Sequence, residues 1–171
     1  MHAETGTLDL EAYGNLLSSK TRLVALGAAS NILGTVTEIA PLARMARDVG
    51  ALIFVDAVHL APHGRIQVGD LRCDFLACSP YKFYGPHMGV LWVRGDLLAE
   101  MDVPKLVPAP NQGPERFESG TVNSEGMAGT TAAVDFIAGL STQEGGSRTG
   151  RLDDVMGAVE IREAALLHRL W

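Results

Sequence analysis

The sequence predicts an α/β fold of three layers, in which a mainly parallel β-sheet carries helices on both faces. Two strand-like apolar runs, residues 22–28 and 52–55, flank a segment with helical apolar spacing. A strand, a helix and a strand in that order form a right-handed crossover between parallel strands. Polar residues follow the strands directly, as they do at the ligand-binding edge of open α/β sheets.

The first half of the chain supplies most of the predicted elements. A short helix is expected from Asp9 to Leu17, and a buried strand from Arg22 to Ala28. Thr37 can cap a helix that runs to Val49, where Gly50 ends it. Its apolar face comprises Ile39, Leu42, Ala43, Ala46 and Val49.

Three further strands and two helices complete the prediction. The strands are expected at residues 52–55, 75–78 and 90–93, and the short loop before the last one favours an antiparallel direction for it. A helix follows at 124–140, then a polar, glycine-rich linker at 142–150 and a final helix from Leu152. Because this last pattern has no cap, we expect the chain to be part of a longer protein.

Composition narrows the classes of function. The chain has 171 residues, 47% of them hydrophobic, which suffices for one domain with a core. A net charge of −6 without a basic cluster argues against nucleic-acid and anionic-membrane partners. No apolar run has the length of a bilayer span, and no signal pattern begins the chain. Two cysteines form no disulfide framework, so a reducing cytoplasm is expected.

Lys82 and Asp56 are the main candidates for chemistry. Lys82 could be an ordinary surface lysine, but Tyr81, Phe83 and Tyr84 surround it in sequence, and partial desolvation would favour its free amine. Asp56, which follows a buried run, could be a simple turn carboxylate. An amine and a carboxylate at the ends of two strands also suit a Schiff-base cofactor, whose ring nitrogen the carboxylate keeps protonated.

Other candidates carry weaker signals. Ser79 could donate to a phosphate, and His59 could contact a ring hydroxyl, although each could be an ordinary loop residue. His59 and His63 have the spacing of helical zinc ligands, but Pro62 and Gly64 disfavour a helix, so no metal is expected. Cys73 and Cys78 are interpreted as buried strand residues. The dinucleotide, Walker and nucleophile-elbow motifs are missing from the sequence.

Four segments in order resemble the fold-type I pyridoxal phosphate (PLP) enzymes of aminotransferase class V, most closely the cysteine desulfurase-like proteins. They are residues 30–35, 55–59, 79–86 and 117–123, and the similarity extends over residues 5 to 171. The resemblance implies that the chain is part of the large PLP-binding domain. Residues 1–150 would form that part, and residues 151–171 would start a long helix leading toward an absent C-terminal small domain.

The resemblance also assigns roles by position. Lys82 would form the Schiff base with PLP, Asp56 would pair with the pyridine nitrogen, and His59 would lie near the ring hydroxyl. Ser79 and Tyr81 would contact the phosphate, although desulfurases commonly have His at the position of Tyr81. Asn31 would face the carboxylate of an amino-acid substrate. Thr121 would reach the phosphate of the neighbouring subunit, which implies a homodimer with shared active sites.

The family's remaining site residues have no counterpart here. The N-terminal phosphate cup, the group that stacks on the cofactor ring, the C-terminal carboxylate-binding Arg and the persulfide-carrying Cys are absent, and neither Cys73 nor Cys78 takes that last position. The chain alone is therefore expected to be inactive. A catalytically silent scaffold or dimerisation fragment of the same fold is the alternative.

Overall fold

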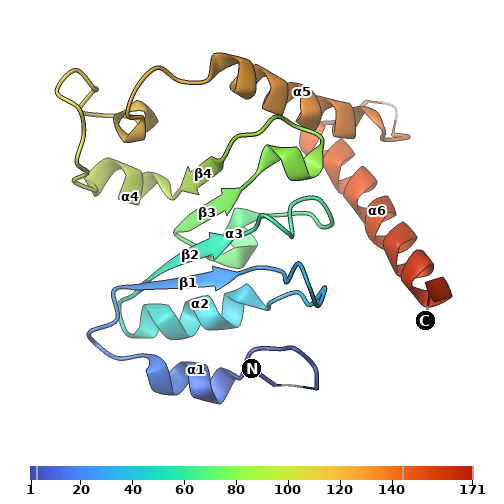
Figure 1. The fold of residues 1–171 in the computed structure, drawn as a ribbon, viewed down its shortest axis with the longest axis horizontal. Helices are drawn as coiled ribbons and strands as arrows, with labels where there is room; N and C mark the ends of the chain where they lie inside the picture. Colours follow the sequence, from blue (N-terminus) through green and yellow to red (C-terminus); the bar gives the residue numbers. More distant parts are fainter. Residues whose placement is uncertain (3, 144, 171) are drawn as a thin grey trace.

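The protein folds around a mixed four-stranded sheet. A computed structural model describes residues 1–2, 4–143 and 145–170; the end of the expected final segment, Trp171, lies outside them. The strands lie in the order β1 (Leu23–Gly27), β2 (Leu52–Asp56), β3 (Phe75–Cys78) and β4 (Val90–Val93). β1, β2 and β3 are parallel and β4 is antiparallel to β3 (Figure 1). The α/β class and the direction of the last strand are confirmed.

Helices connect and flank the strands. They are α1 (Leu10–Leu16), α2 (Ile39–Asp48), α3 (Val68–Leu71), α4 (Gly95–Glu100), α5 (Ser124–Gly139) and α6 (Arg148–Leu170), with the 3-10 helices η1 (Pro80–Phe83) and η2 (Pro114–Phe117). The expected helices at residues 9–17, 37–49 and 124–140 are confirmed, each to within a few residues. α6 begins four residues before the expected Leu152, because the turn at Ser147 already belongs to its first helical hydrogen bonds.

The core lies between α2 and the sheet. The apolar side of α2 buries Ile39, Leu42, Ala43 and Ala46, as its spacing predicts. Ile39, Ala43 and Ala46 share one core cluster with Ile53 and Val55 of β2. Because side chains alternate along a strand, Phe54 and Asp56 belong to the opposite face. On that face Leu98 of α4 and Phe117 of η2 border a cavity together with Phe54 and Val93.

The expectation of a buried first strand is wrong. β1 is the edge strand of the described sheet, and its residues alternate between exposed and half-buried. Leu23 is 53% exposed, and its register partner Leu52 is half-buried. The apolar run therefore predicted the strand correctly, but it did not predict whether other elements would bury both faces of that strand.

A buried carboxylate ties the strands together behind the core. Asp74, 1% exposed, accepts a hydrogen bond of 2.7 Å from the backbone N–H of Ile53. It also pairs with the guanidinium groups of Arg47 on α2 and Arg94 after β4. One side chain thus joins β2, α2 and the end of β4, and it fixes how β3 enters the sheet.

Candidate active site

The parallel strands end at one edge of the sheet, and the candidate residues follow these ends (Figure 1). The register places Gly27, Asp56 and Ala77 side by side across β1, β2 and β3. The ladder continues one residue further, with N–H to O distances of 2.8 Å from Ala28 to Asp56 and from Ala57 to Ala77. Asp56 is therefore fixed one strand away from the residues that lead into Ser79.

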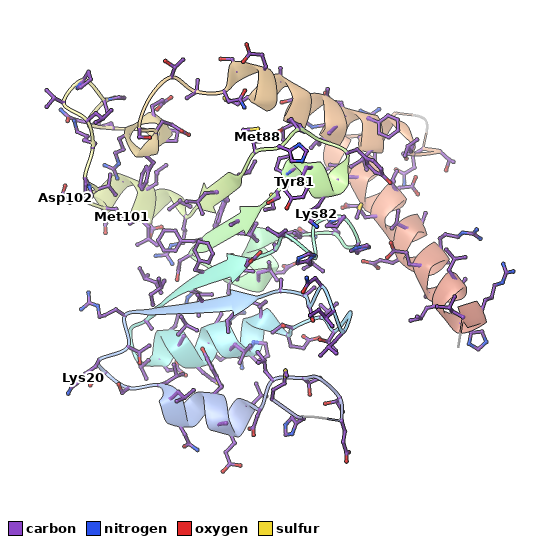
Figure 2. The ribbon with its side chains drawn as sticks, viewed as in Figure 1. Lys20, Tyr81, Lys82, Met88, Met101 and Asp102 are labelled. Carbon is purple, nitrogen blue, oxygen red and sulfur yellow. The ribbon has the colours of Figure 1, made fainter. Side chains whose placement is uncertain are left out.

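Lys82 is held on a rigid turn. Buried Pro80 begins η1, and the turn is closed by hydrogen bonds from Lys82 N to Ser79 O (3.0 Å) and from Gly85 N to Pro80 O (2.8 Å). Lys82 is exposed at its turn rather than enclosed, so the expected desolvation by neighbouring rings is wrong. Its Nζ lies 5.3 Å from the ring centroid of Tyr81 (Figure 2), which leaves the amine accessible.

Asp56 presents a free carboxylate at the end of β2. It is exposed, and one oxygen accepts a hydrogen bond of 2.9 Å from the N–H of Val58. Within the described residues neither Asp56 nor Lys82 forms a salt bridge. The hydrogen bond to Val58 matches the simple turn interpretation, while the second oxygen remains available to a cationic ring nitrogen.

Ser79 and His59 complete the edge. Both are half-buried, and the Ser79 hydroxyl makes no capping hydrogen bond to η1. Ser79, Ala77 and Val58 border the cavity on the open sheet face, which has a volume of about 650 Å³. That volume suits a small organic cofactor. Asp56 and Lys82 lie beside its lining residues without lining it themselves.

Asn31 and Thr121 are placed differently. Asn31 is exposed in the loop after β1, where the Ser30 hydroxyl accepts from the N–H groups of Ile32 and Leu33 and so shapes the turn. Thr121 is exposed and borders a separate cavity of about 330 Å³ with Glu118. The structure thus gathers the strand-end residues at one edge, whereas Thr121 shares no described cavity with them.

Sequence patterns missed two contacts around Lys82. The imidazole of His87 stacks on the phenol of Tyr81, with ring centroids 5.1 Å apart and planes at 14°. Tyr84 adopts a left-handed backbone with φ of 69° and meets Phe136 of α5 edge to face. Only the aromatic composition of residues 81–87 hinted at them, because ring stacking has no sequence period.

The remaining candidates are structural. The interpretation of both cysteines as buried strand residues is wrong in part, because Cys78 is in β3 but half-buried, whereas Cys73 is buried but precedes that strand; both thiols are free. Burial raises the pKa of each thiol, which keeps them protonated and unreactive. His63 pairs with Glu163 of α6, Nδ1 to Oε1, at 2.8 Å. Among the described residues no three ligand-type side chains gather as a metal site would require.

Comparison with known proteins identifies the family to which this fold belongs. A model of the aminotransferase class-V family matches residues 2–156. The chain belongs to the aminotransferase class-V family. A probable cysteine desulfurase of Xylella fastidiosa is 34% identical over 179 residues, which cover 96% of this chain and 39% of that protein. A cysteine desulfurase of an Enterobacter species is 38% identical over 148 residues, covering 79% and 36% of the two chains.

Solved structures agree with the family assignment. The apo cysteine desulfurase of Thermococcus onnurineus superimposes with a TM-score of 0.80 at 30% identity, covering 99% of this chain and 42% of that one. The chain therefore spans about two fifths of the length of the class-V relatives that it matches. In the part of the chain that the structure describes, no helix is long and apolar enough to cross a membrane.

Proposed function

We propose that the whole protein is a PLP-dependent enzyme that acts on an amino acid, as a cysteine desulfurase-like member of its family. One observation supports this most strongly. Lys82 and Asp56 follow adjacent parallel strands, and neither is paired with a described charged residue. An accessible amine and a free carboxylate at one sheet edge are the donor set that a pyridine aldehyde requires.

The other residues at this edge fit the same cofactor. The amine of Lys82 would bond to the aldehyde carbon, and Asp56 would hold the ring nitrogen protonated. Ser79, whose hydroxyl is uncommitted to η1, would donate to the phosphate beside Tyr81. His59 would lie near the ring hydroxyl. These roles rest on strand register and on the chemistry of each group.

Bound PLP supplies an electron sink for the carbanion formed on the substrate. Lys82 would move the proton at the substrate carbon, because it is the amine nearest the strand ends. Asn31, exposed on the neighbouring loop, would bind the substrate carboxylate. Desulfuration, transamination, racemisation and elimination all share this first proton transfer.

We also propose that the protein is a homodimer and that it resides in the cytoplasm; Thr121 and the two cysteines support this. Thr121 is exposed and borders a different cavity from Ser79, as expected of a residue that serves the site of a second copy in a homodimer. Both cysteines are free, which suits a reducing cytoplasm.

A visible-absorption titration with PLP tests the proposal. The protein, joined to the family segments that this chain does not span, is expected to show the yellow imine band, and Lys82→Ala abolishes it. The chain alone is expected to bind weakly. A joined protein that stays colourless would contradict the proposal and favour a catalytically silent scaffold. That alternative remains because the chain covers only about two fifths of its relatives.

A further inference from the structure

We propose that His87 is a positioning residue for Lys82 and that it acts through the ring of Tyr81. The inference rests on the proposed function, in which the amine of Lys82 bonds to an aldehyde. It concerns three side chains of one turn, and only Lys82 and Tyr81 had a role suggested by the sequence.

The geometry links the three groups in a row. The imidazole of His87 lies nearly parallel to the phenol of Tyr81, at 14° and with 5.1 Å between centroids, which is a stacking contact. The ammonium of Lys82 lies 5.3 Å from the centroid of that same phenol, within the range of cation–π attraction. Tyr81 therefore contacts the reactive amine and His87 at once.

The phenol of Tyr81 needs such a contact to keep its orientation. Its side chain is 44% exposed, so neighbouring side chains do not enclose the ring. Exposed aromatic side chains without a fixed partner exchange rotamers rapidly. Stacking on His87 is a contact that restricts the planes that this ring can adopt.

The backbone around His87 is anchored firmly enough to serve as a support. Met88 N donates to Pro86 O at 2.9 Å, which closes the turn on either side of His87. The hydroxyl of Thr130 on α5 lies 3.1 Å from the sulfur of Met88, and a Cβ built on Gly129 of α5 would lie 3.3 Å from the Pro86 ring. α5 thus supports the backbone of the turn that carries His87. The side chains of His87, Tyr81 and Lys82 then contact one another in that order.

The face of the Tyr81 ring in turn attracts the ammonium group of Lys82. Its attraction limits the positions that Nζ can take. If His87 no longer holds the phenol, the amine loses this contact and can reach more positions. Lys82 should then react faster with a small aldehyde, although it would be less well placed for a bulky one.

Reductive methylation with formaldehyde and cyanoborohydride tests this in the chain as it stands, without PLP. The sequence holds three lysines, so Lys20 and Lys105 serve as internal references in peptide mass spectrometry. Lys20 lies on the far side of the fold from Lys82 (Figure 2). We expect His87→Ala to raise the labelling of Lys82 relative to the references by about two- to fivefold. His87→Phe keeps a flat ring and should restore the wild-type ratio.

A second variant separates positioning through Tyr81 from a direct effect of His87. Tyr81→Leu should raise the Lys82 ratio by the same factor, and adding His87→Ala to it should change nothing further. An unchanged ratio in His87→Ala, no restoration by His87→Phe, or a full effect of His87→Ala in the Tyr81→Leu background would overturn the proposal. Failure of the PLP titration would leave these ratios as expected, so the two proposals fail separately.

Discussion

Asp74 shows how one buried residue organises the scaffold of the site. Its oxygens take the N–H of Ile53 and two guanidinium groups, and the carboxylate is almost fully buried. A charge in this position stabilises the fold only while every partner remains in place. The sequence pattern did not single it out, because a carboxylate before a strand looks the same whether it is buried or solvated.

Replacing Asp74 should therefore destabilise the fold strongly. Asp74→Ala leaves the Ile53 amide without a partner and two arginines without their shared charge, which we expect to cost about 3 kcal/mol in the free energy of unfolding. Urea denaturation followed by circular dichroism measures it. Asp96→Ala is the matched control, since Asp96 binds the same Arg94 from an exposed position and should leave the midpoint near that of the wild type. Equal losses in both variants would contradict the role of Asp74.

The two thiols provide a test of burial at the same scale. Burial raises the pKa of Cys73 and Cys78, so each stays neutral to a higher pH than an exposed cysteine. Native chain should be alkylated by iodoacetamide much more slowly than chain unfolded in urea, and the difference should shrink as the pH rises. Fast alkylation of native Cys73 at neutral pH would show that the core is open there.

At the scale of elements, the turn at residues 79–85 gives the site its rigidity. A Cβ built on Gly85 would lie 2.7 Å from Cβ of Pro80 and 3.0 Å from its carbonyl oxygen. Neither neighbour can move easily, because Pro80 is buried and its carbonyl accepts the closing hydrogen bond. The turn that presents Lys82 therefore depends on glycine at this position.

Gly85→Ala is expected to strain this turn and lower the free energy of unfolding by roughly 2 kcal/mol, the usual range for overpacking. Gly89→Ala makes a close control, since nothing lies within 4 Å of the point that its added methyl group would occupy and its φ is outside the left-handed region. Thermal melts of the two variants should differ clearly. A Gly85→Ala variant as stable as the Gly89→Ala variant would show that the turn is pliable.

The elements that sequence predicted best are those with a strong period or a clear end signal. α2 has a continuous apolar stripe and ends at Asp48, two residues before Gly50, whose φ of 80° favours glycine. α3 and α4 went unpredicted because four and six residues are too few to display a helical period. The candidate residues at strand ends were predictable from topology, whereas the accessibility of Lys82 and the stack on Tyr81 depend on three-dimensional neighbours.

At the scale of the whole molecule, the fold brings an amine and a carboxylate from segments 26 positions apart to one edge, as strand register dictates. α5 packs against α6 and also contacts η1, so it supports the turn that carries Lys82 (Figure 1). The chain spans about two fifths of its relatives, so these two residues, with His59, Ser79 and Tyr81, would form the part of the proposed cofactor site that this chain itself supplies.

Borohydride trapping of PLP tests most directly whether Asp56 and Lys82 belong to one cofactor-binding site. The chain is mixed with PLP and reduced, and the pyridoxyl label on each of its three lysines is quantified by mass spectrometry. We expect label to concentrate on Lys82 over Lys20 and Lys105, and Asp56→Asn to remove that preference. Equal labelling of all three lysines, or a preference for Lys82 that survives Asp56→Asn, would contradict the shared site.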